Sequence, residues 1–314
     1  MPRRTNAITT EFTACRWLNM REALEHFGTY SGVTQSAEHI KPLHWYVACR
    51  LVVEGGFHPD EVMPHPPFHV DSRRGKHYLV YDESRATGGE RTVLGGLKTK
   101  NVDVVVTKEG IGPVLAVSCK GMTRAFRNLT NRMEDTIGEC TNLHITYPAM
   151  VFGYIFVIRA NREVLAVADH LPPEYAEPTR QLKANDIAVQ QGGEPVESII
   201  RFHAALKELT GRKGIRNDVS RYEAVTLAMI ETTGDSAGDL LAHFPPLGSP
   251  LRIEGFFQTL YLRYEERYLL GAPDLKSVTR RLEWASDSPG LQVDGLPPAD
   301  AYPELDYEAR IQSE

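Results

Sequence analysis

An aspartate and a lysine interrupt two neighbouring valine-rich runs of this sequence. Asp103 stands near the start of the first run, NVDVVVT, and Lys120 ends the second, VLAVSCK. The sequence KEGIGP between them is rich in turn-forming residues, so the two runs are predicted to be adjacent strands. Side chains alternate along a strand, which places Ser118 and Lys120 on one face and Cys119 on the other. Such a hairpin can hold Asp103 and Lys120 side by side at one edge of a sheet.

These residue types suit the hydrolysis of phosphate esters. Carboxylate oxygens are ligands that Mg²⁺ accepts readily, and a lysine ammonium can orient an attacking water or offset developing negative charge. Phosphodiester hydrolysis needs an activated water and a stabilised, highly charged transition state, and bound metal ions can provide both. The pairing of Asp103 with Lys120 therefore predicts a metal-dependent nuclease.

A helix is predicted over residues 122–138, directly after the second run. Its apolar side chains recur at helical spacing and are Met122, Phe126, Leu129, Met133 and Ile137. Four polar residues fall within a separate arc of about 80° and are Arg124, Arg127, Asn131 and Glu134. We expect the first face to pack on the sheet and the second to face phosphate groups, with Arg132, Lys98 and Lys100 as further basic contacts.

Asp103 together with Ser118-Cys119-Lys120 resembles the active site of the PD-(D/E)XK phosphodiesterase superfamily of Mg²⁺-dependent nucleases. In that superfamily an aspartate on one strand is followed by a (D/E)xK triplet on the next. A serine replaces the second acid here. The pattern is similar to that of restriction endonucleases with an SxK triplet, in which the next helix supplies the acid at the spacing K-x13-E. Glu134 stands at that distance from Lys120.

The resemblance implies an α/β, restriction-endonuclease-like fold, with a mixed central sheet flanked by helices. The residue patterns that follow this region predict a mainly helical C-terminal half, which the resemblance does not cover. It implies a DNA endonuclease of restriction or phage-defence type that uses Mg²⁺, with Mn²⁺ as an alternative. Asp103 and Glu134 would bind the metal, as would the Cys119 carbonyl and, through water, Glu54. Lys120 would act on the attacking water, and Ser118 would support the metal ligands. The implied partners are double-stranded DNA, further copies in a homodimer or higher homo-oligomer, and proteins of a defence system.

The order of patterns predicts four parts along the 314 residues. They are a helical N-terminal part over 1–60, a nuclease-like α/β core over 61–165, a mainly helical part over 166–284, and an acidic, proline-containing tail over 285–314. The motif SRYE at 220–223 resembles a capping box and predicts a helix as far as about residue 231. An aromatic, amphipathic helix over 253–268 is predicted to lie in the core or at a subunit interface. The tail is expected to be disordered or to lie along the surface.

The charge distribution is compatible with a nucleic-acid partner. The formal net charge is −6, and the tail from residue 285 onward has seven acids against Arg310 alone, so the remainder is neutral. Backbone contacts to DNA need a local basic face and not a basic average. The four cysteines form no CxxC motif, and no apolar run approaches the length of a membrane span. We therefore expect a cytoplasmic protein with no membrane association.

Two other classes of function fit the same sequence. A nuclease fold can be catalytically inert and bind nucleic acid as a sensor subunit. Alternatively, the aromatic helix over 253–268 can serve assembly in a scaffold protein. Three histidines, His58, His65 and His69, lie in a proline-rich loop, but their spacing matches no closed zinc site.

Overall fold

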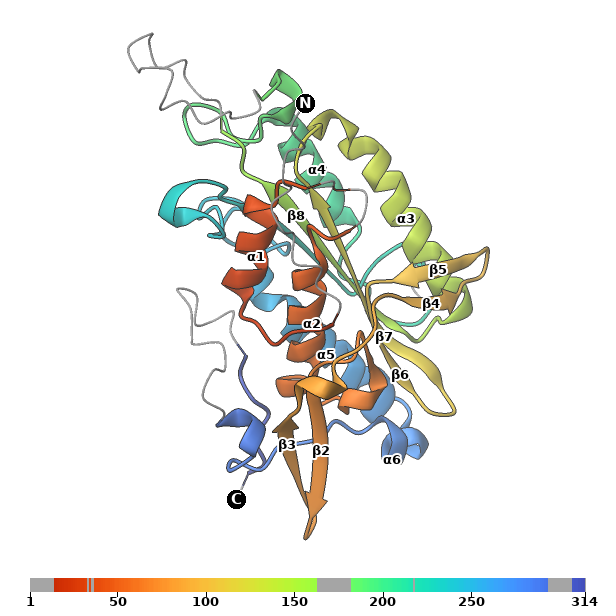
Figure 1. Cartoon of the computed structure of the whole chain (residues 1–314). Coiled ribbons are helices and arrows are strands. Elements are labelled where there is room, and N and C mark those ends of the chain that lie inside the picture. Colours follow the sequence, from red (N-terminus) through yellow and green to blue (C-terminus); the bar gives the residue numbers. More distant parts are fainter. Residues whose placement is uncertain are drawn as a thin grey trace, which may run out of the picture.

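The computed structural model describes residues 14–32, 34, 37–162, 182–216, 218–292 and 307–313, apart from the Arg127 side chain. A five-stranded mixed sheet runs through the centre of this part of the chain (Figure 1). Its strands, in spatial order, are β1 (Val62–Met63), β6 (Val104–Lys108), β7 (Gly112–Met122), β8 (Val151–Arg159) and β9 (Ala224–Ile230). Strand β6 is antiparallel to both of its neighbours, β1 and β7, whereas β7, β8 and β9 are parallel. This arrangement confirms the expected α/β class.

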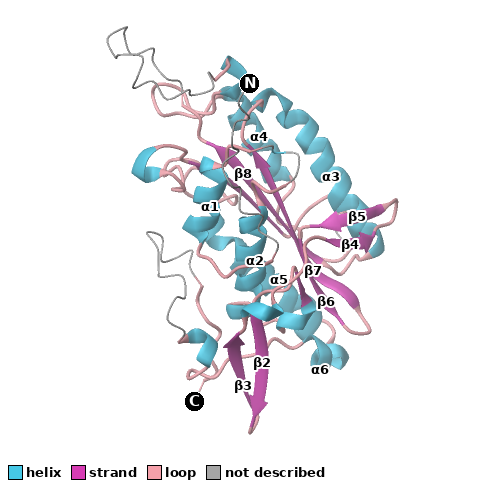
Figure 2. Ribbon diagram, in the orientation of Figure 1, coloured by secondary structure: helices cyan, strands magenta, loops and turns pink. Residues whose placement is uncertain are grey.

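Helices cover both faces of the sheet, as Figure 2 shows. The helices are α1 (Met20–Thr29), α2 (Lys41–Val53), α3 (Leu129–Thr146), α4 (Glu197–Glu208), α5 (Phe256–Tyr264) and the short α6 (Lys276–Thr279). Helices α1, α2 and α5 share one hydrophobic core with Val117 and Cys119 of β7, whereas α3 and α4 share a second core with Ala116. Because β7 alternates between these two cores, Ser118 and Lys120 face the α3 side, as the strand pattern predicts.

Two separate hairpins accompany the sheet. One consists of β2 (Phe68–Arg73) and β3 (Lys76–Tyr81), and the other of β4 (Arg91–Leu94) and β5 (Thr99–Val102). The side chain of Asn142 on α3 anchors the tip of the second hairpin. Its Oδ1 accepts hydrogen bonds from the backbone N–H groups of Leu97 and Lys98, at 2.8 and 3.1 Å, and its Nδ2 donates to the Lys98 carbonyl at 2.9 Å. The β4–β5 hairpin is thereby held over the α3 side of the sheet.

The predicted helix over 122–138 is wrong at its start. Strand β7 continues to Met122, which pairs with Ile158 of β8, and a short 3-10 turn, η4 (Phe126–Asn128), precedes α3. Pairing with a parallel neighbour has fixed these residues in the sheet, where tertiary context overrides a local helical pattern. The helix therefore begins at Leu129 and extends eight residues beyond the predicted end, to Thr146.

The shifted helix also packs with a different face. Ile137, which was expected to be buried, is 38% exposed, while Thr136 and Cys140 are buried. On a helical wheel Glu139 lies on the flank of this buried face, and Glu134 is turned about 140° away from it. The packing of α3 thus decides which glutamate approaches the sheet.

The predicted helix over 220–231 is also wrong, because Ala224–Ile230 is strand β9. All seven of its residues are buried. A parallel strand that is covered on both faces reads as a continuous apolar run and carries no alternation to reveal it. The expected helical part over 166–284 consequently contributes a strand to the central sheet. Glu223 does not cap a helix but forms hydrogen bonds with the backbone of Phe152 in β8, directly before β9 begins.

The aromatic stripe over 253–268 lies in the core. Helix α5 continues into a π-helical turn, η9 (Glu265–Leu270), and Phe257 and Tyr264 are fully buried. The aromatic residues of this stripe are buried within the chain, so they do not form an exposed surface for assembly with another protein. Residues 307–313 of the expected tail lie against the body, where the Arg310 N–H donates to the Val53 carbonyl at 3.0 Å. Residues 293–306 are outside the described part. None of the described helices is long and apolar enough to cross a membrane.

Candidate active site

Asp103 is the centre of a polar cluster at the end of the sheet. It lies between β5 and β6, where the chain passes from the hairpin into the central sheet, and it is 3% exposed. Its Oδ2 accepts three hydrogen bonds, from the Cys119 N–H at 2.7 Å, from Ser118 Oγ at 3.0 Å and from Lys120 Nζ at 2.6 Å. The predicted proximity of Asp103, Ser118 and Lys120 is confirmed, but Asp103 is buried and does not lie on an exposed strand edge as expected.

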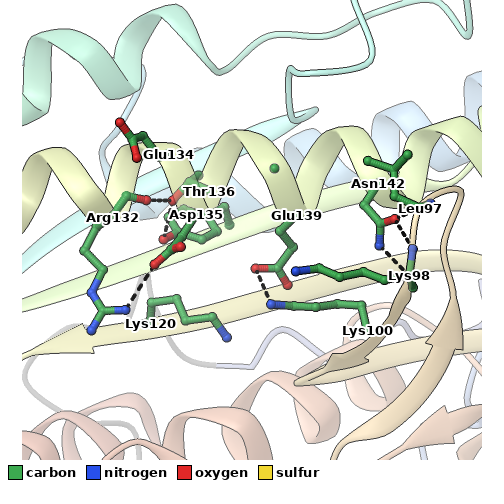
Figure 3. Close-up of a pocket in the computed structure, with 12 residues that line it drawn as sticks. Leu97, Lys98, Lys100, Lys120, Arg132, Glu134, Asp135, Thr136, Glu139 and Asn142 are labelled. Atoms are coloured by element: carbon green, nitrogen blue, oxygen red, sulfur yellow. Dashed lines mark hydrogen bonds and ion pairs between the residues drawn. The ribbon is translucent and has the colours of Figure 1, made fainter.

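A second acid, Glu139 of α3, joins this cluster through Ser118. Ser118 Oγ lies 3.1 Å from Glu139 Oε1, and Lys100 Nζ from β5 lies 3.4 Å from Glu139 Oε2 (Figure 3). A serine hydroxyl carries one proton and cannot donate fully to Asp103 and Glu139 at once. Burial raises the pKa of Glu139, although Lys120 and Lys100 act in the opposite direction. A proton held on Glu139 would satisfy both contacts.

Glu134, expected from the K-x13-E spacing, is not part of this cluster. Figure 3 shows its carboxylate pointing away from Lys120, whereas Glu139 points toward the two lysines. Glu134 is exposed at the rim of the cleft, while Glu139 is 6% exposed. The expectation that Glu134 supplies the relocated acid therefore needs correction, because the register of α3 brings Glu139 to Ser118.

A cleft of about 480 Å³ opens between α3, β7 and the β4–β5 hairpin. Its polar walls include Lys98, Lys100, Lys120, Arg132, Glu139 and Asn142. The expected basic face is divided. Lys98, Lys100 and Arg132 line the cleft, and Arg132 is 3.4 Å from Asp135. Arg124 lies in the turn before η4, and Asn131 is exposed on α3 without lining the cleft. The Arg127 side chain is outside the described part.

The charges at the cleft floor stabilise one another. Burial alone would raise the pKa of Asp103, but His44, Lys120 and the hydrogen bonds to Oδ2 together lower it. Burial alone would lower the pKa of Lys120, but Asp103 and Glu139 raise it above its ordinary value. Lys120 is consequently a protonated donor at neutral pH and Asp103 is ionised. In this state the lysine can orient a water or a phosphate oxygen but cannot accept a proton.

Two residues that the sequence patterns did not single out complete the surroundings of Asp103. His44 of α2 places Nε2 3.9 Å from Asp103 Oδ1, and burial lowers the pKa of His44, which leaves the imidazole neutral. Glu90, just before β4, is exposed. Single ligand atoms of His44, Glu90 and Asp103 all lie within 4.8 Å of one another, so these three residues could hold a metal ion. The only feature of the sequence that could have indicated a role for His44 is its position as a polar residue in the apolar helix sequence PLHWYVACRLVV.

The other expected metal ligands have different surroundings. Glu54 follows the end of α2, about 15 Å along the helix from His44. Its carboxylate pairs with Arg50 at 2.9 Å and is 7% exposed, so the expected role of Glu54 at the metal needs correction. The Cys119 backbone lies close enough to His44 to affect the pKa of its imidazole, so the Cys119 carbonyl remains a candidate metal ligand. The Cys119 side chain points into the opposite core.

Comparisons with known proteins identified no related protein. No protein-family model, no curated protein and no solved structure matches this chain.

Proposed function

We propose that this chain is a metal-dependent nuclease that hydrolyses phosphodiester bonds of DNA bound in the cleft, of the restriction or phage-defence type. One observation carries the proposal. Lys120 Nζ lies 2.6 Å from Asp103 Oδ2, and Lys120 lines a cleft whose walls carry four basic and three acidic side chains. An ion pair that only stabilises the fold does not have to lie beside an open cleft. The partly exposed ammonium of Lys120 is instead placed where a ligand can reach it.

The donor set fits a divalent cation. His44 Nε2 is buried without a hydrogen-bond partner, and it faces the one oxygen of Asp103 that the strand donors do not use. A cation bound at Asp103 would supply positive charge to the transition state and lower the pKa of a bound water. The residues that would hold it are Asp103, His44 and Glu90, with the Cys119 carbonyl nearby.

The chain's own residues would orient and stabilise the substrate. Lys120 is 32% exposed at its side chain and can donate to a phosphate oxygen without leaving Asp103, because an ammonium has three protons. This fixed positive charge would offset the negative charge that develops on the phosphate. Glu139, with its raised pKa, is placed to exchange a proton through Ser118.

Basic residues along the cleft would hold the nucleic-acid backbone. Lys98 and Arg132 lie on opposite walls, from the β4–β5 hairpin and from α3. Phosphate contacts of this kind set the position of a strand but do not read its sequence. These residues would therefore bind the nucleic-acid backbone irrespective of its base sequence.

The test is a cleavage assay on the full chain with supercoiled plasmid, linear duplex, single-stranded DNA and RNA. Each substrate is incubated with Mg²⁺, with Mn²⁺ and with a chelator. Asp103→Asn and Lys120→Met should abolish cleavage, and Glu134→Gln, a change in the same cleft, should keep it. Cleavage that survives in both inactive-site variants would refute the proposal. Binding to DNA without cleavage under any metal would instead favour an inert nucleic-acid-binding subunit.

A further inference from the structure

The two oxygens of the Asp103 carboxylate have opposite surroundings. Oδ2 faces the strands and accepts from the Cys119 N–H, Ser118 and Lys120. Oδ1 faces α2, where His44 Nε2 lies 3.9 Å away. The carboxyl group of Glu90 also interacts with the Asp103 carboxylate, from the segment before β4. All three of these donors contact Oδ2, and none of them contacts Oδ1. The α2 side of Asp103 therefore has acceptor capacity that the strand donors do not use.

His44 aims an unpartnered nitrogen into this same space. The side chain is 5% exposed, and Nε2 has no hydrogen-bond partner in the described chain. A buried polar atom without a partner is uncommon, because the lost contact with water costs about 1–3 kcal/mol. Two ligands of one transition-metal ion, each about 2.0–2.2 Å from it, lie roughly 3–4 Å apart. The gap between Nε2 and Oδ1 has the span of such a shared ion.

Glu90 adds a second carboxylate on the same side. One of its oxygens lies within 4.8 Å of the ligand atoms of both His44 and Asp103. Two carboxylates at this separation repel each other, and the repulsion is strong where one of them is buried. A divalent cation between them would remove the repulsion. Because Glu90 is exposed, the ion would keep open positions toward solvent.

We propose that His44, Glu90 and Asp103 form a binding site for a divalent first-row transition-metal ion, for which Mn²⁺ is the suitable probe. One imidazole nitrogen with two carboxylates suits such ions, whereas Mg²⁺ binds almost entirely through oxygen. The site differs from the oxygen-only Mg²⁺ set expected from the sequence, since α2 and the segment before β4 supply two of its three ligands. The role of the ion in cleavage rests on the proposed function, but its binding does not.

The arrangement gives the two sides of Asp103 separate tasks. The ion would lie on the Oδ1 side, and Lys120 would remain on the Oδ2 side at 2.6 Å. Asp103 would thus bind the metal ion through one oxygen and the Lys120 ammonium through the other, and neither cation would displace the other. Substitution of His44 or Glu90 should therefore weaken metal binding while the hydrogen bonds among Asp103, Ser118 and Lys120 persist.

The test measures metal binding directly. The full chain is titrated with Mn²⁺, free Mn²⁺ is followed by electron paramagnetic resonance, and the titration is repeated with equimolar Mg²⁺ as competitor. We expect one Mn²⁺ per chain, little displacement by Mg²⁺, and an electron spin-echo signal from a coordinated nitrogen. His44→Gln should remove the nitrogen signal, and Glu90→Gln should weaken binding at least about tenfold. Glu134→Gln, an equally exposed acid in the neighbouring cleft, is the matched control.

Each outcome decides between the two proposals. Unchanged Mn²⁺ binding in His44→Gln and Glu90→Gln, or full displacement by equimolar Mg²⁺, overturns the metal site. If buried His44→Gln does not fold, exposed Glu90→Gln still gives the answer. Mn²⁺ binding that depends on these residues in a chain that cleaves nothing supports the site and refutes the nuclease. Unchanged Mn²⁺ binding in both variants, together with Mg²⁺-dependent cleavage that neither substitution changes, refutes the site and leaves the nuclease standing.

Discussion

Two buried carboxylates in this chain, Glu223 and Asp103, have opposite balances of charge. Glu223, beside β9, pairs with Arg212 at 2.8 Å and with Arg267 at 2.6 Å, and its Oε2 accepts from the Phe152 N–H at 2.6 Å. The side chains of Glu223 and Arg212 are fully buried, and that of Arg267 is 6% exposed. One acid thus meets two permanent cations in a closed space.

The cluster around Asp103 has the reverse balance and an open side. Three acids, Asp103, Glu90 and Glu139, share two lysines and a neutral histidine. Lys120 and Lys100 keep about a third of their side chains exposed, at 32% and 31%, along the cleft. The acidic residues outnumber the permanent cations by one, and burial raises the pKa of both Glu139 and Glu90. The nitrogen of His44 beside them has no hydrogen-bond partner among the described residues.

This difference separates a structural cluster from a candidate functional one. A buried ion pair with every charge compensated holds elements together, and here Arg267 connects η9 to the start of β8 through the Met150 carbonyl at 3.0 Å. An excess of one sign beside a cleft is unfavourable for the empty protein and becomes favourable only when a ligand of opposite charge binds. Depth of burial alone would have ranked the two carboxylates together.

The largest expected effect is on stability, at Glu223. Glu223→Gln leaves Arg212 and Arg267 buried with no compensating charge, which should lower the free energy of unfolding by about 3–5 kcal/mol. Asp103→Asn keeps a side-chain oxygen for the Cys119 N–H and leaves Lys120 partly exposed to water, so the free energy of unfolding should fall by a smaller amount, about 1–2 kcal/mol. Urea unfolding followed by circular dichroism measures both. A larger loss in Asp103→Asn than in Glu223→Gln would reverse the assignment of roles.

The same comparison predicts the pH dependence of folding. The pKa of Glu223 is lowered from 4.5 to about 2, because His144, Arg267 and the Phe152 N–H outweigh burial, which alone would raise it. Its contribution is therefore complete above pH 4.5 and is lost as the pH falls toward 2, by on the order of 3 kcal/mol. Glu139, whose pKa is raised, acts in the opposite direction and gains stability on protonation.

Urea unfolding at several pH values between about 5 and about 2 tests this prediction. The wild-type chain should lose stability steeply through this window, and Glu223→Gln should show a flatter profile from a lower starting value. Equal slopes for the two proteins would show that Glu223 is not the group that couples folding to acid.

A smaller effect is expected from the two candidate acids on α3. If the proposed function holds, Glu139→Gln should reduce cleavage by about a hundredfold, or about 2.7 kcal/mol. Glu134→Gln should remain within about twofold of wild type, because its carboxylate points away from Lys120. Initial rates on a linear duplex with excess metal measure both. The opposite ranking would restore the K-x13-E assignment.

The sequence predicted the parts of the site that depend on strand alternation. Ser118 and Lys120 lie on β7, and Asp103 directly precedes the adjacent strand β6. A side-chain period of two and a short turn determine which of these side chains meet. The segment containing Glu139 could not be placed in this way. Its approach depends on where β7 ends, and that boundary is set by pairing with β8, a strand about thirty residues later in the chain.

Residues contributed by distant elements were beyond the reach of local patterns. His44 lies 59 positions before Asp103, and its helix is buried so completely that no polar face marks it. Strand β9 was read as a helix for a related reason, since burial on both faces removes alternation. Sequence periodicity arises where one face of a helix or strand contacts water and the other contacts the core. These two segments are buried on all sides, so their sequences show no such periodicity.

The smallest predicted effect concerns the cleft walls. Each phosphate contact contributes about 0.9 to the slope of log affinity against log salt for duplex DNA. Lys98 lines the cleft. The substitution Lys98→Ala should therefore reduce the salt slope by about this amount. Arg124→Ala is the matched control, because Arg124 lies before η4 and not on the cleft wall. Fluorescence anisotropy with the inactive Asp103→Asn protein gives the slopes without cleavage. A flattened slope in Arg124→Ala, with none in Lys98→Ala, would place the backbone along the turn between β7 and α3, as the sequence pattern first predicted.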